Sequence, residues 1–373
     1  MSGDQENLQQ QLAGAAPRRL RLHVLGCLIA ALTSCSGISA LHRSALVSVV
    51  YGDLDDVDPR RPIVFLGDTQ RTWIIERIGF REQNDYEREQ ILMLVADENP
   101  VPGLIAHLGD MVLWGSRDTD WRWFDELIEP LAEIPLLPAL GNHDFWGSNE
   151  KAWTHLTARF PQLKKKRWYI RRYGPLALVW LDSNRSDMEY DDWLRQFGWY
   201  EKVLDRLEHD PSVRGVVILS HYPPFTNNTR TSDERDLHVF LHSFCAARKT
   251  MAWISGHAHG YERLPKGNKT FLVTGGAGGP RVHYRVGRKR RHDDTLNTRG
   301  RRPFNYVRLS LKGAGATILV RGLQKGQPYR EAKPIDEFEL SFPTKTGTCG
   351  SPPDHPAGPL SHLGQGARTG AWR

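Results

Sequence analysis

The sequence predicts an α/β sandwich in which two mixed β-sheets pack face to face and helices cover the outside, an α/β-β/α arrangement of four layers. Short apolar runs rich in β-branched residues alternate with amphipathic stretches of helical period. Several of these runs end directly in polar residues, as strands do at the carboxyl edge of an open sheet. The last strand-like runs follow one another without helices between them. With 373 residues and 39% hydrophobic content, the chain can bury a sizeable core.

The first 35 residues are predicted to be a signal peptide. The apolar run at 20–32 follows a group of arginines and, at about a dozen residues, is too short to span a bilayer but typical of a secretory segment. It ends in Leu32-Thr33-Ser34-Cys35, which resembles the bacterial lipobox, where the cysteine is acylated after cleavage. We therefore expect an extracytoplasmic lipoprotein, in the periplasm or at the cell surface, whose lipid anchor on Cys35 is its membrane contact. The alternative is a plain signal peptide with a coincidental cysteine.

Composition divides the rest of the chain into three parts. Residues 36–61 end in an acidic, proline-bearing stretch and are predicted to be a tether. Residues 62–342 carry the strand and helix patterns and form the expected folded domain. Residues 343–373 are rich in Gly, Pro, Ser and Thr with little apolar content, so we expect a disordered tail.

The expected elements follow in order from the periodicity. A strand, a helix and a second strand at the start of the domain predict a right-handed βαβ unit with a parallel pair, and Gly174-Pro175 predicts a hairpin. Thr231 to Glu234 fit a capping box that opens a helix. The expected strands are 63–66, 104–108, 134–140, 168–173, 176–181, 215–219, 251–254, 270–274, 305–311, 316–320 and 337–342. The expected helices are 84–99, 120–131, 148–160, 196–209 and 231–248.

Charge and cysteine content leave several partners open. The net charge of +7 suits phosphorylated or polyanionic partners, but a solvated basic surface explains it equally well. The basic segment 281–302 is expected to be a disordered surface loop, with an arm that contacts phosphates or lipids as the alternative. Four cysteines are too few for a disulfide scaffold or a zinc knuckle. A Cys245–Cys349 bridge could form in an oxidising compartment, but the position of Cys349 in the tail argues against it.

Candidate metal ligands follow five of the apolar runs. They are Asp68, Gln70, Asp110, Asn142, His221, His257 and His259. This mixture of carboxylate, imidazole and amide oxygen suits borderline or hard divalent ions. Seven ligands are too many for one tetrahedral ion, but with one shared carboxylate they suffice for two ions, roughly 3.5–4 Å apart, as in two-metal phosphoryl-transfer sites.

The ordered motifs Gly-Asp-x-Gln, Gly-Asp, Gly-Asn-His-Asp, His and Gly-His-x-His resemble the calcineurin-like metallophosphoesterase superfamily, nearest its purple acid phosphatase branch. The resemblance implies the metallophosphoesterase-type sandwich. It also implies one metal ion on Asp68, Gln70, Asp110 and His259, and a second on Asp110, Asn142, His221 and His257. His143 would act as general acid or as hydrogen-bond donor to phosphate, and Asp144 would orient its ring and keep it protonated.

Two departures from the family pattern have chemical consequences. Gln70 stands where most members have His, and a neutral amide oxygen should favour harder ions such as manganese or magnesium. Leu113 stands where purple phosphatases have the Tyr that binds iron(III), so we expect no purple colour.

Each site residue also has a structural alternative. Asp68 could cap a turn, Gln70 could point away, His143 could be a ligand or a structural donor, and Asp144 could cap a helix. The Gly275–Gly279 run lacks the Gly-Lys-Ser/Thr of a phosphate loop and is expected to be a tight return loop. Adjacency suggests that Trp146, Tyr222, Tyr261 and Arg263 line the substrate pocket.

The expected function is therefore hydrolysis of a phosphate ester by a metal-bridging hydroxide, as a phosphatase or phosphodiesterase with two divalent ions (Mn, Fe, Zn or Mg). A nucleic acid is expected only as a substrate. The alternative is a non-catalytic surface protein in which Gln70 marks a decayed metal site and the basic segment 281–302 binds polyanions.

Overall fold

The computed structural model describes residues 57–296, 298, 300–344 and 348–349. The expected signal peptide with Cys35, most of the expected tether and most of the expected tail lie outside these residues.

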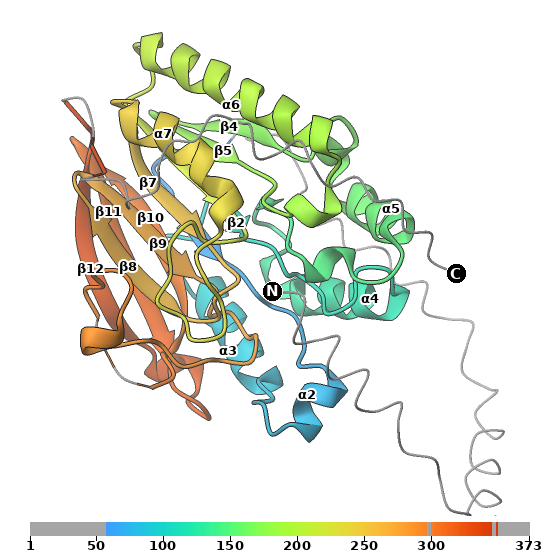
Figure 1. Cartoon of the computed structure of the whole chain (residues 1–373). Coiled ribbons are helices and arrows are strands. Elements are labelled where there is room, and N and C mark those ends of the chain that lie inside the picture. Colours follow the sequence, from blue (N-terminus) through green and yellow to red (C-terminus); the bar gives the residue numbers. More distant parts are fainter. Residues whose placement is uncertain (1–56, 297, 299, 345–347, 350–373) are drawn as a thin grey trace, which may run out of the picture. The chain divides into compact units, whose positions relative to one another are not determined.

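Two mixed six-stranded sheets form the centre of the fold (Figure 1), as the sequence predicts. The first sheet runs in the order β12 (Lys333–Ser341), β11 (Gly315–Leu323), β10 (Phe304–Lys312), β1 (Ile63–Leu66), β2 (Leu104–His107) and β3 (Leu136–Pro138). The second runs in the order β4 (Tyr169–Tyr173), β5 (Leu176–Trp180), β6 (Gly215–Ser220), β7 (Thr250–Ser255), β9 (Lys269–Thr274) and β8 (Tyr261–Lys266). In the first sheet β1, β2 and β3 are parallel, and β10 joins them antiparallel to β1. In the second sheet β5, β6, β7 and β9 are parallel.

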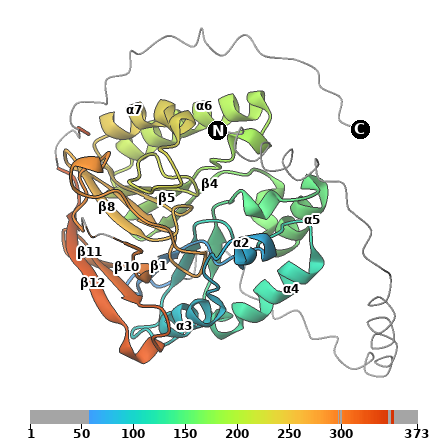
Figure 2. The same cartoon turned by 60° about the horizontal axis from the view of Figure 1, so that its bottom comes forward.

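Helices cover the outer faces of both sheets (Figure 2). The helices are α2 (Ile74–Ile78), α3 (Asp85–Ala96), α4 (Asp118–Leu127), α5 (Asn149–Arg159), α6 (Tyr190–His209) and α7 (His238–Ala246). Figure 2 shows α6 and α7 beyond the sheet that contains β4 and β5, and α3 and α4 on the opposite side, beyond β1. The four-layer arrangement is confirmed.

The central strands are buried on both faces, which explains their nearly continuous apolar sequences. In β5, Leu178 and Trp180 belong to a core cluster that includes Tyr306 of the first sheet. Val179 points the other way, into a second cluster that includes Phe240 of α7. Because side chains alternate along a strand, one apolar run supplies the core between the sheets and the layer beneath the helices.

Some element boundaries differ from the prediction. The predicted helix 231–248 begins only at His238, after a 3₁₀ turn in which the Glu234 side chain accepts a hydrogen bond from the Asp236 amide. The capping box at Thr231 is therefore wrong. Strand β8 and the short helix α2 were not predicted, because neither segment shows a clear period of two or of 3.6.

Contrary to the prediction of a disordered loop, the basic segment 281–302 is folded against the domain. Its two end residues are buried, and each pairs with a carboxylate: Arg281 with Glu82 at 2.9 Å, and Arg302 with Asp294. Isolated β-bridges also join the segment to the chain near Asn228 and within itself. The exposed basic side chains lie between these anchors.

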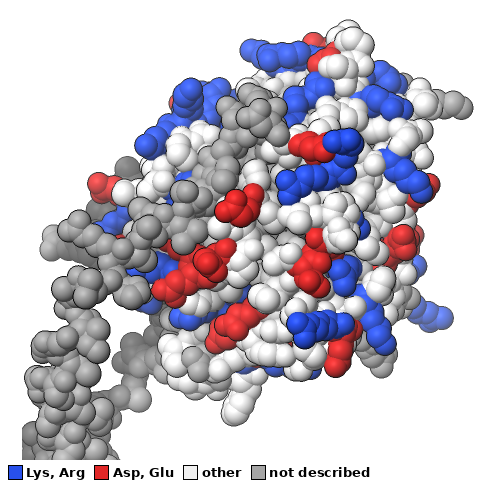
Figure 3. All heavy atoms as spheres, turned by 180° about the vertical axis from the view of Figure 1, so that it is seen from behind, with Lys and Arg blue, Asp and Glu red and all other residues white. Residues whose placement is uncertain are grey.

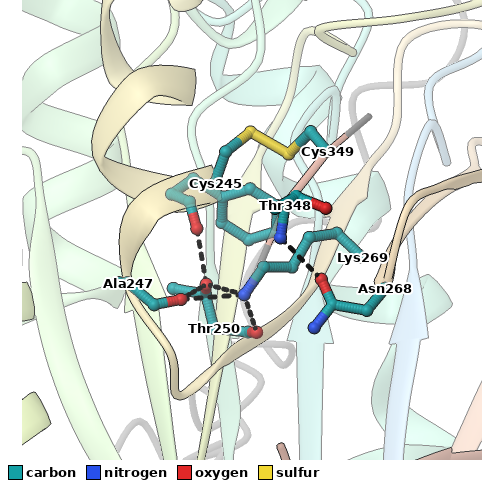
Figure 4. Close-up of a disulfide and its surroundings, with 8 residues drawn as sticks. Cys245, Ala247, Thr250, Asn268, Lys269, Thr348 and Cys349 are labelled. Atoms are coloured by element: carbon teal, nitrogen blue, oxygen red, sulfur yellow. Dashed lines mark hydrogen bonds between the residues drawn. A yellow bond between two sulfur atoms is a disulfide. The ribbon is translucent and has the colours of Figure 1, made fainter. Parts of the chain in front are cut away.

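A disulfide joins Cys245 at the end of α7 to Cys349, which the sequence analysis placed in a disordered tail (Figure 4). The Cα atoms of the two cysteines are 5.3 Å apart, and 104 positions separate them in the sequence. Next to the disulfide, the Thr348 amide donates to Asn268 Oδ1 at 2.9 Å, and the Asn268 amide donates to the Thr348 carbonyl at 3.2 Å. The expectation that Cys349 is unpaired is wrong, because its segment forms specific contacts with the turn before β9.

The surface seen in Figure 3 carries both signs of charge, with Lys and Arg interspersed among Asp and Glu. The positive net charge is thus not gathered in one patch on this face. Among the residues that the structure describes, no helix is both long enough and apolar enough to cross a bilayer.

Candidate metal centre

The candidate ligands converge where strands of the two sheets end. Asp110, His221 and His257 each offer a ligand atom, and these atoms lie within 4.8 Å of one another. Asp68, Asp110 and His259 form a second such group. The two groups share Asp110, and they draw on the segments after β1, β2, β6 and β7. Parallel strands place their carboxyl ends at one edge of a sheet, which is why distant residues meet here.

The backbone at this edge is strained. Five non-glycine residues of the described chain have a positive φ, and four of them are candidate ligands: Asp68 (64°), Asp110 (55°), His257 (63°) and His259 (27°). Such conformations cost on the order of 1–3 kcal/mol each and cluster at functional sites. Because a sharp left-handed turn follows each strand, the side chain points across the sheet edge into the centre.

Backbone hydrogen bonds fix these turns to one another. The Asp68 amide donates to the Gly109 carbonyl at 3.0 Å, and the Gln70 amide donates to the Asp110 carbonyl at 3.1 Å. The His257 amide donates to both carboxylate oxygens of Asp68, at 2.8 and 3.0 Å. The ligand-bearing loops are thus cross-linked independently of any ion.

The first group contains ring nitrogens and oxygens that face one another. His221 Nε2 lies 3.4 Å from Asp110 Oδ1, 3.2 Å from Asn142 Oδ1 and 3.1 Å from His257 Nδ1. Two imidazole nitrogens at this distance need a proton or a cation between them, because their lone pairs repel. This geometry fits a cation held by Asp110, Asn142, His221 and His257.

The second group contains a buried oxygen without a partner. His259 Nε2 lies 3.4 Å from Asp68 Oδ1. Gln70 Nε2 donates to Asp110 Oδ2 at 3.1 Å and lies 3.2 Å from His259 Nε2, while Gln70 Oε1 is buried with no hydrogen-bond partner. A rotation of the amide by 180° would place Oε1 among the other ligand atoms. The residue therefore reaches the centre, as predicted, and an oxygen ligand fits it.

Carbonyl groups outside the centre set the orientation of three histidine rings. Nδ1 of His221 contacts the Leu108 carbonyl at 2.8 Å, and Nδ1 of His259 contacts the Pro280 carbonyl at 2.9 Å. Nδ1 of His143 contacts the Leu113 carbonyl at 3.0 Å. Because a carbonyl only accepts, each neutral ring carries its hydrogen on Nδ1 and turns the lone pair of Nε2 toward the centre, as metal-binding histidines do.

The electrostatics of the centre favour an ionised bridging carboxylate. Burial opposes ionisation of Asp110, but the neighbouring charges of His221 and His143 hold its pKa below the usual range. Burial also disfavours the charged form of His221, yet Asp110 raises its pKa to about 9. Burial and the charge of His221 lower the pKa of His257. Asp110 is thus deprotonated at neutral pH, which is the form a metal ligand requires.

His143 lies at the edge of the centre rather than within either group. Its Nε2 is 4.0 Å from Asp110 Oδ2, and its ring lies over Trp146 with the ring centroids 3.7 Å apart. The ring is partly exposed. His143 can therefore exchange a proton with a group bound beside the ligands.

Asp144 does not contact the His143 ring, so its expected orienting role is wrong. Its buried carboxylate accepts hydrogen bonds from the amides of Gly141 at 2.9 Å, Asp110 at 3.1 Å and Met111 at 2.8 Å, and Val112 N lies 3.4 Å away. Asp144 therefore holds the backbone of the loop that carries Asp110. The ring orientation of His143 comes from the Leu113 carbonyl instead.

Close packing explains the glycines of the motifs. A Cβ atom on Gly141 would lie 2.1 Å from the Asp110 amide nitrogen, and one on Gly275 would lie 2.4 Å from Asp68 Oδ2. Both positions therefore need glycine so that the carboxylates can occupy their places.

Two positioning residues were missed by the sequence analysis. Asn228 Nδ2 donates to the Ala258 carbonyl at 3.0 Å, and the Tyr284 hydroxyl donates to the same oxygen. Ala258 lies between His257 and His259, so both contacts hold the ligand-bearing turn. No local pattern marks Asn228 or Tyr284, because their partner is a backbone oxygen distant in sequence.

The residues suggested to line the pocket divide into two pairs. Trp146 stacks on His143, and the Tyr222 ring lies 4.2 Å from that of His257, centroid to centroid. Tyr261 is buried and donates to Asp336, and Arg263 pairs with the same carboxylate. The suggestion was therefore wrong for Tyr261 and Arg263, since alternation along β8 and its sheet contacts turn them toward β12.

Comparisons with known proteins agree with this geometry. The family model of the calcineurin-like phosphoesterase matches residues 61–261. The chain is similar in structure to purple acid phosphatase PPD1 from yellow lupin (Lupinus luteus) seeds, with a TM-score of 0.61, 17% identity and coverage of 80% of this chain and 57% of that one. It thus spans little more than half of the lupin enzyme.

Two other solved structures share the fold. GAP50, described as the anchor in the inner membrane complex of Plasmodium, has a TM-score of 0.56 and 13% identity, with 76% of this chain and 90% of that chain covered. A dimetal phosphatase from Danio rerio has a TM-score of 0.51 and 14% identity, with 76% and 100% covered.

Proposed function

The chain belongs to the calcineurin-like phosphoesterase family, and from this premise we propose that it hydrolyses phosphate esters with two divalent metal ions. The observation that carries the proposal is the pair of ligand groups that share Asp110, with all ligand atoms of each group within 4.8 Å. Strained backbone at four of the ligands supports it, because such strain is found where function requires it.

The residues present fit two ions. Asp68, Asp110 and His259, with the oxygen of Gln70, would hold one, and Asp110, Asn142, His221 and His257 would hold the other. When bound, two such ions supply Lewis-acid stabilisation of phosphate charge and a water of lowered pKa. The amide oxygen of Gln70 in place of imidazole favours manganese or magnesium at the first position.

In its protonated form, His143 would donate a proton or a hydrogen bond from Nε2 to the ester. Its Nδ1 is engaged by the Leu113 carbonyl, so Nε2 is the atom available to substrate. A histidine in this position typically contributes about 10²–10⁴-fold to the rate. The stacked Trp146 ring restricts the imidazole to one orientation and shields one of its faces from water.

The test uses the full chain, stripped of metal and reloaded with manganese, and assays aryl phosphate monoesters and diesters. Asp110→Asn should lose both metal binding and hydrolysis. His143→Ala should keep its metal and lose about 10²–10⁴-fold in rate, while His242→Ala, an exposed histidine of α7, serves as the matched control. If His143→Ala hydrolysed the aryl phosphates at the wild-type rate, the role assigned to His143 would be wrong.

We further propose that the protein is an extracytoplasmic lipoprotein. The lipobox-like sequence ending in Cys35 supports this location. The Cys245–Cys349 disulfide supports it independently, since such bonds persist in oxidising compartments. Labelling with a radioactive fatty acid in a bacterial host, compared between the wild type and Cys35→Ser, tests the anchor. If the wild type were not labelled, Cys35 would not be acylated, and residues 1–35 would act as a plain signal peptide.

A non-catalytic role as a surface protein is the rival function. In the structure Gln70 donates to Asp110 from within the centre, which is the observation that favours a decayed site. The two outcomes differ in metal content: about two ions per chain accompany the enzyme, whereas less than one ion and salt-sensitive binding of polyanions would accompany the rival. GAP50 shares this fold and is described as the anchor in the inner membrane complex of Plasmodium.

A further inference from the structure

An exposed apolar projection lies next to the metal centre. Helix α2 and the residues after it expose Ile74, Ile78 and Phe80, whose exposed fractions are 56%, 73% and 94%. Helix α2 lies at the lower end of the described domain in Figure 1. Phe80 also has a positive φ of 59°. Left-handed backbone is strained for a bulky residue, and exposure of an apolar ring to water is unfavourable as well. A residue that combines the two indicates a functional role. We call these three side chains the apolar projection.

The base of the apolar projection is fixed while its tip is free. Thr72 Oγ1 donates to the Glu82 carbonyl at 2.6 Å and so brings the two ends of the segment together. Arg81 pairs with Glu76 and donates to the Pro280 carbonyl at 3.1 Å. That carbonyl also accepts from the ring of His259. The base of the projection is therefore linked, through the Pro280 carbonyl, to the ring of His259.

A continuous run of tryptophans leads from the apolar projection to His143. Trp73 directly precedes Ile74, and its ring centroid lies 6.3 Å from those of both Trp114 and Trp146. The Trp146 ring in turn covers His143 at 3.7 Å. All three indoles are partly exposed. They come from the segments after β1, β2 and β3, so the fold builds one apolar wall along one side of the centre.

The charges around the apolar projection are predominantly positive. Arg230 and Arg301 are both exposed. Burial lowers the pKa of Arg81, and the charges of Arg230 and Arg301 lower it further, which places these guanidinium groups together. The carboxylate of Glu82 is shared by Arg281 and Arg301. Exposed apolar side chains close to exposed arginines are complementary to an anionic lipid surface, where apolar side chains enter the interface and cations meet phosphates.

We propose that the apolar projection docks the protein on a lipid surface and that the substrate is a phosphate ester carried by a lipid. The occupant is a membrane rather than a protein groove, because the three apolar side chains, on α2 and just after it, are exposed near the exposed cations Arg230 and Arg301. The tryptophan wall would then hold the apolar part of the lipid while its phosphate reaches His143 and the metal ligands. The lipid substrate rests on the proposed phosphoesterase function, whereas docking on the lipid surface does not.

The test compares two double variants of the full chain, both in a Cys35→Ser background so that no acyl chain contributes. The first, Ile78→Ser with Phe80→Ser, removes the tip of the apolar projection. The matched control, Leu194→Ser with Val239→Ser, removes two exposed apolar side chains from α6 and α7, whose exposed fractions are 39% and 42%. Each protein is mixed with vesicles of phosphatidylcholine, with and without phosphatidylglycerol, and the bound fraction is measured by sedimentation.

The projection variant should bind the anionic vesicles at least about tenfold more weakly than wild type and the control variant, since each apolar side chain that leaves water stabilises the bound state. It should lose a similar factor in hydrolysis of phosphatidic acid embedded in vesicles, with unchanged hydrolysis of a soluble aryl phosphate. Binding of the projection variant equal to wild type would overturn the proposal and leave a protein partner or a second copy as the occupant. Wild-type protein without aryl phosphatase activity would refute the proposed function alone, because vesicle binding is read separately.

Discussion

Replacing Asp144 by alanine should destabilise the domain without changing the orientation of the His143 ring. The side chain is fully buried, and its oxygens accept three backbone hydrogen bonds of 3.1 Å or less, from Gly141, Asp110 and Met111. Each buried amide left without an acceptor costs about 1–3 kcal/mol. Three such amides give roughly 3–9 kcal/mol, and water that enters the vacated space offsets part of this cost. We therefore expect the free energy of unfolding to fall by about 3–5 kcal/mol.

Urea unfolding followed by tryptophan fluorescence measures this loss, and Asp144→Asn provides the matched control. The asparagine keeps one acceptor oxygen but turns an NH₂ group toward backbone donors, so it should lose stability too, by less than the alanine variant. Both variants should retain the basic limb of the wild-type pH–rate profile wherever they remain folded, because Asp144 does not touch the His143 ring.

The opposite result would restore the role that the sequence suggested. If Asp144→Ala unfolds at the wild-type urea concentration and its pH–rate profile shifts as that of His143 variants does, Asp144 acts through the imidazole. The hydrogen bonds from Gly141 and from the loop after β2 to Asp144 would then contribute little to stability.

Three further predictions follow from other regions. Cys245→Ser with Cys349→Ser opens a loop spanning 104 positions and should reduce the free energy of unfolding by about 2–4 kcal/mol; equal urea midpoints for the reduced and oxidised wild type would contradict this. Burial raises the pKa of Glu262 from its usual value of 4.5 to about 7, so the folded protein keeps a proton that the unfolded chain releases, and wild-type stability falls as pH rises between these values. Glu262→Gln removes this penalty and should gain about 3 kcal/mol on wild type from pH 4.5 to pH 7.5, which urea unfolding across the pH range measures. Gln70→His should raise the zinc content relative to manganese after dialysis against both ions, and an unchanged ratio would remove Gln70 from the ligands.

Most of the strands and the position of the centre were predictable because they depend on simple periodicity. Runs such as 215–219 are apolar throughout, which is the pattern expected of a strand that is buried on both faces. Where such a run ends in His221, the chain leaves the sheet at its carboxyl edge, so the histidine must lie near the ends of the neighbouring strands. The same reasoning applied to Asp68 and Asp110, and the structure brings all three together.

The remaining features depend on contacts that the local sequence does not encode. Asp144 follows a histidine, and adjacency suggested a partnership, but a 3₁₀ turn directs its carboxylate back to amides more than 30 positions earlier. Cys349 lies in a stretch of low apolar content, and only the hydrogen bonds between Thr348 and Asn268 place it beside α7. The apolar projection lacks helical period, and its exposure results from tertiary structure alone.

The buried Asp144 carboxylate stabilises the strained backbone of the turn that carries Asp110. Left-handed backbone at Asp110 is unfavourable, and an isolated loop would relax out of it. Asp144 prevents this by binding the amides of Asp110 and Met111 at once, while the Gln70 amide holds the carbonyl of Asp110 from the other side. The backbone that carries the carboxylate shared by both candidate ligand groups is thus held in place by protein groups alone. Metal affinity should consequently depend on Asp144 although it is not a ligand, since its loss frees the one residue that both ligand groups share.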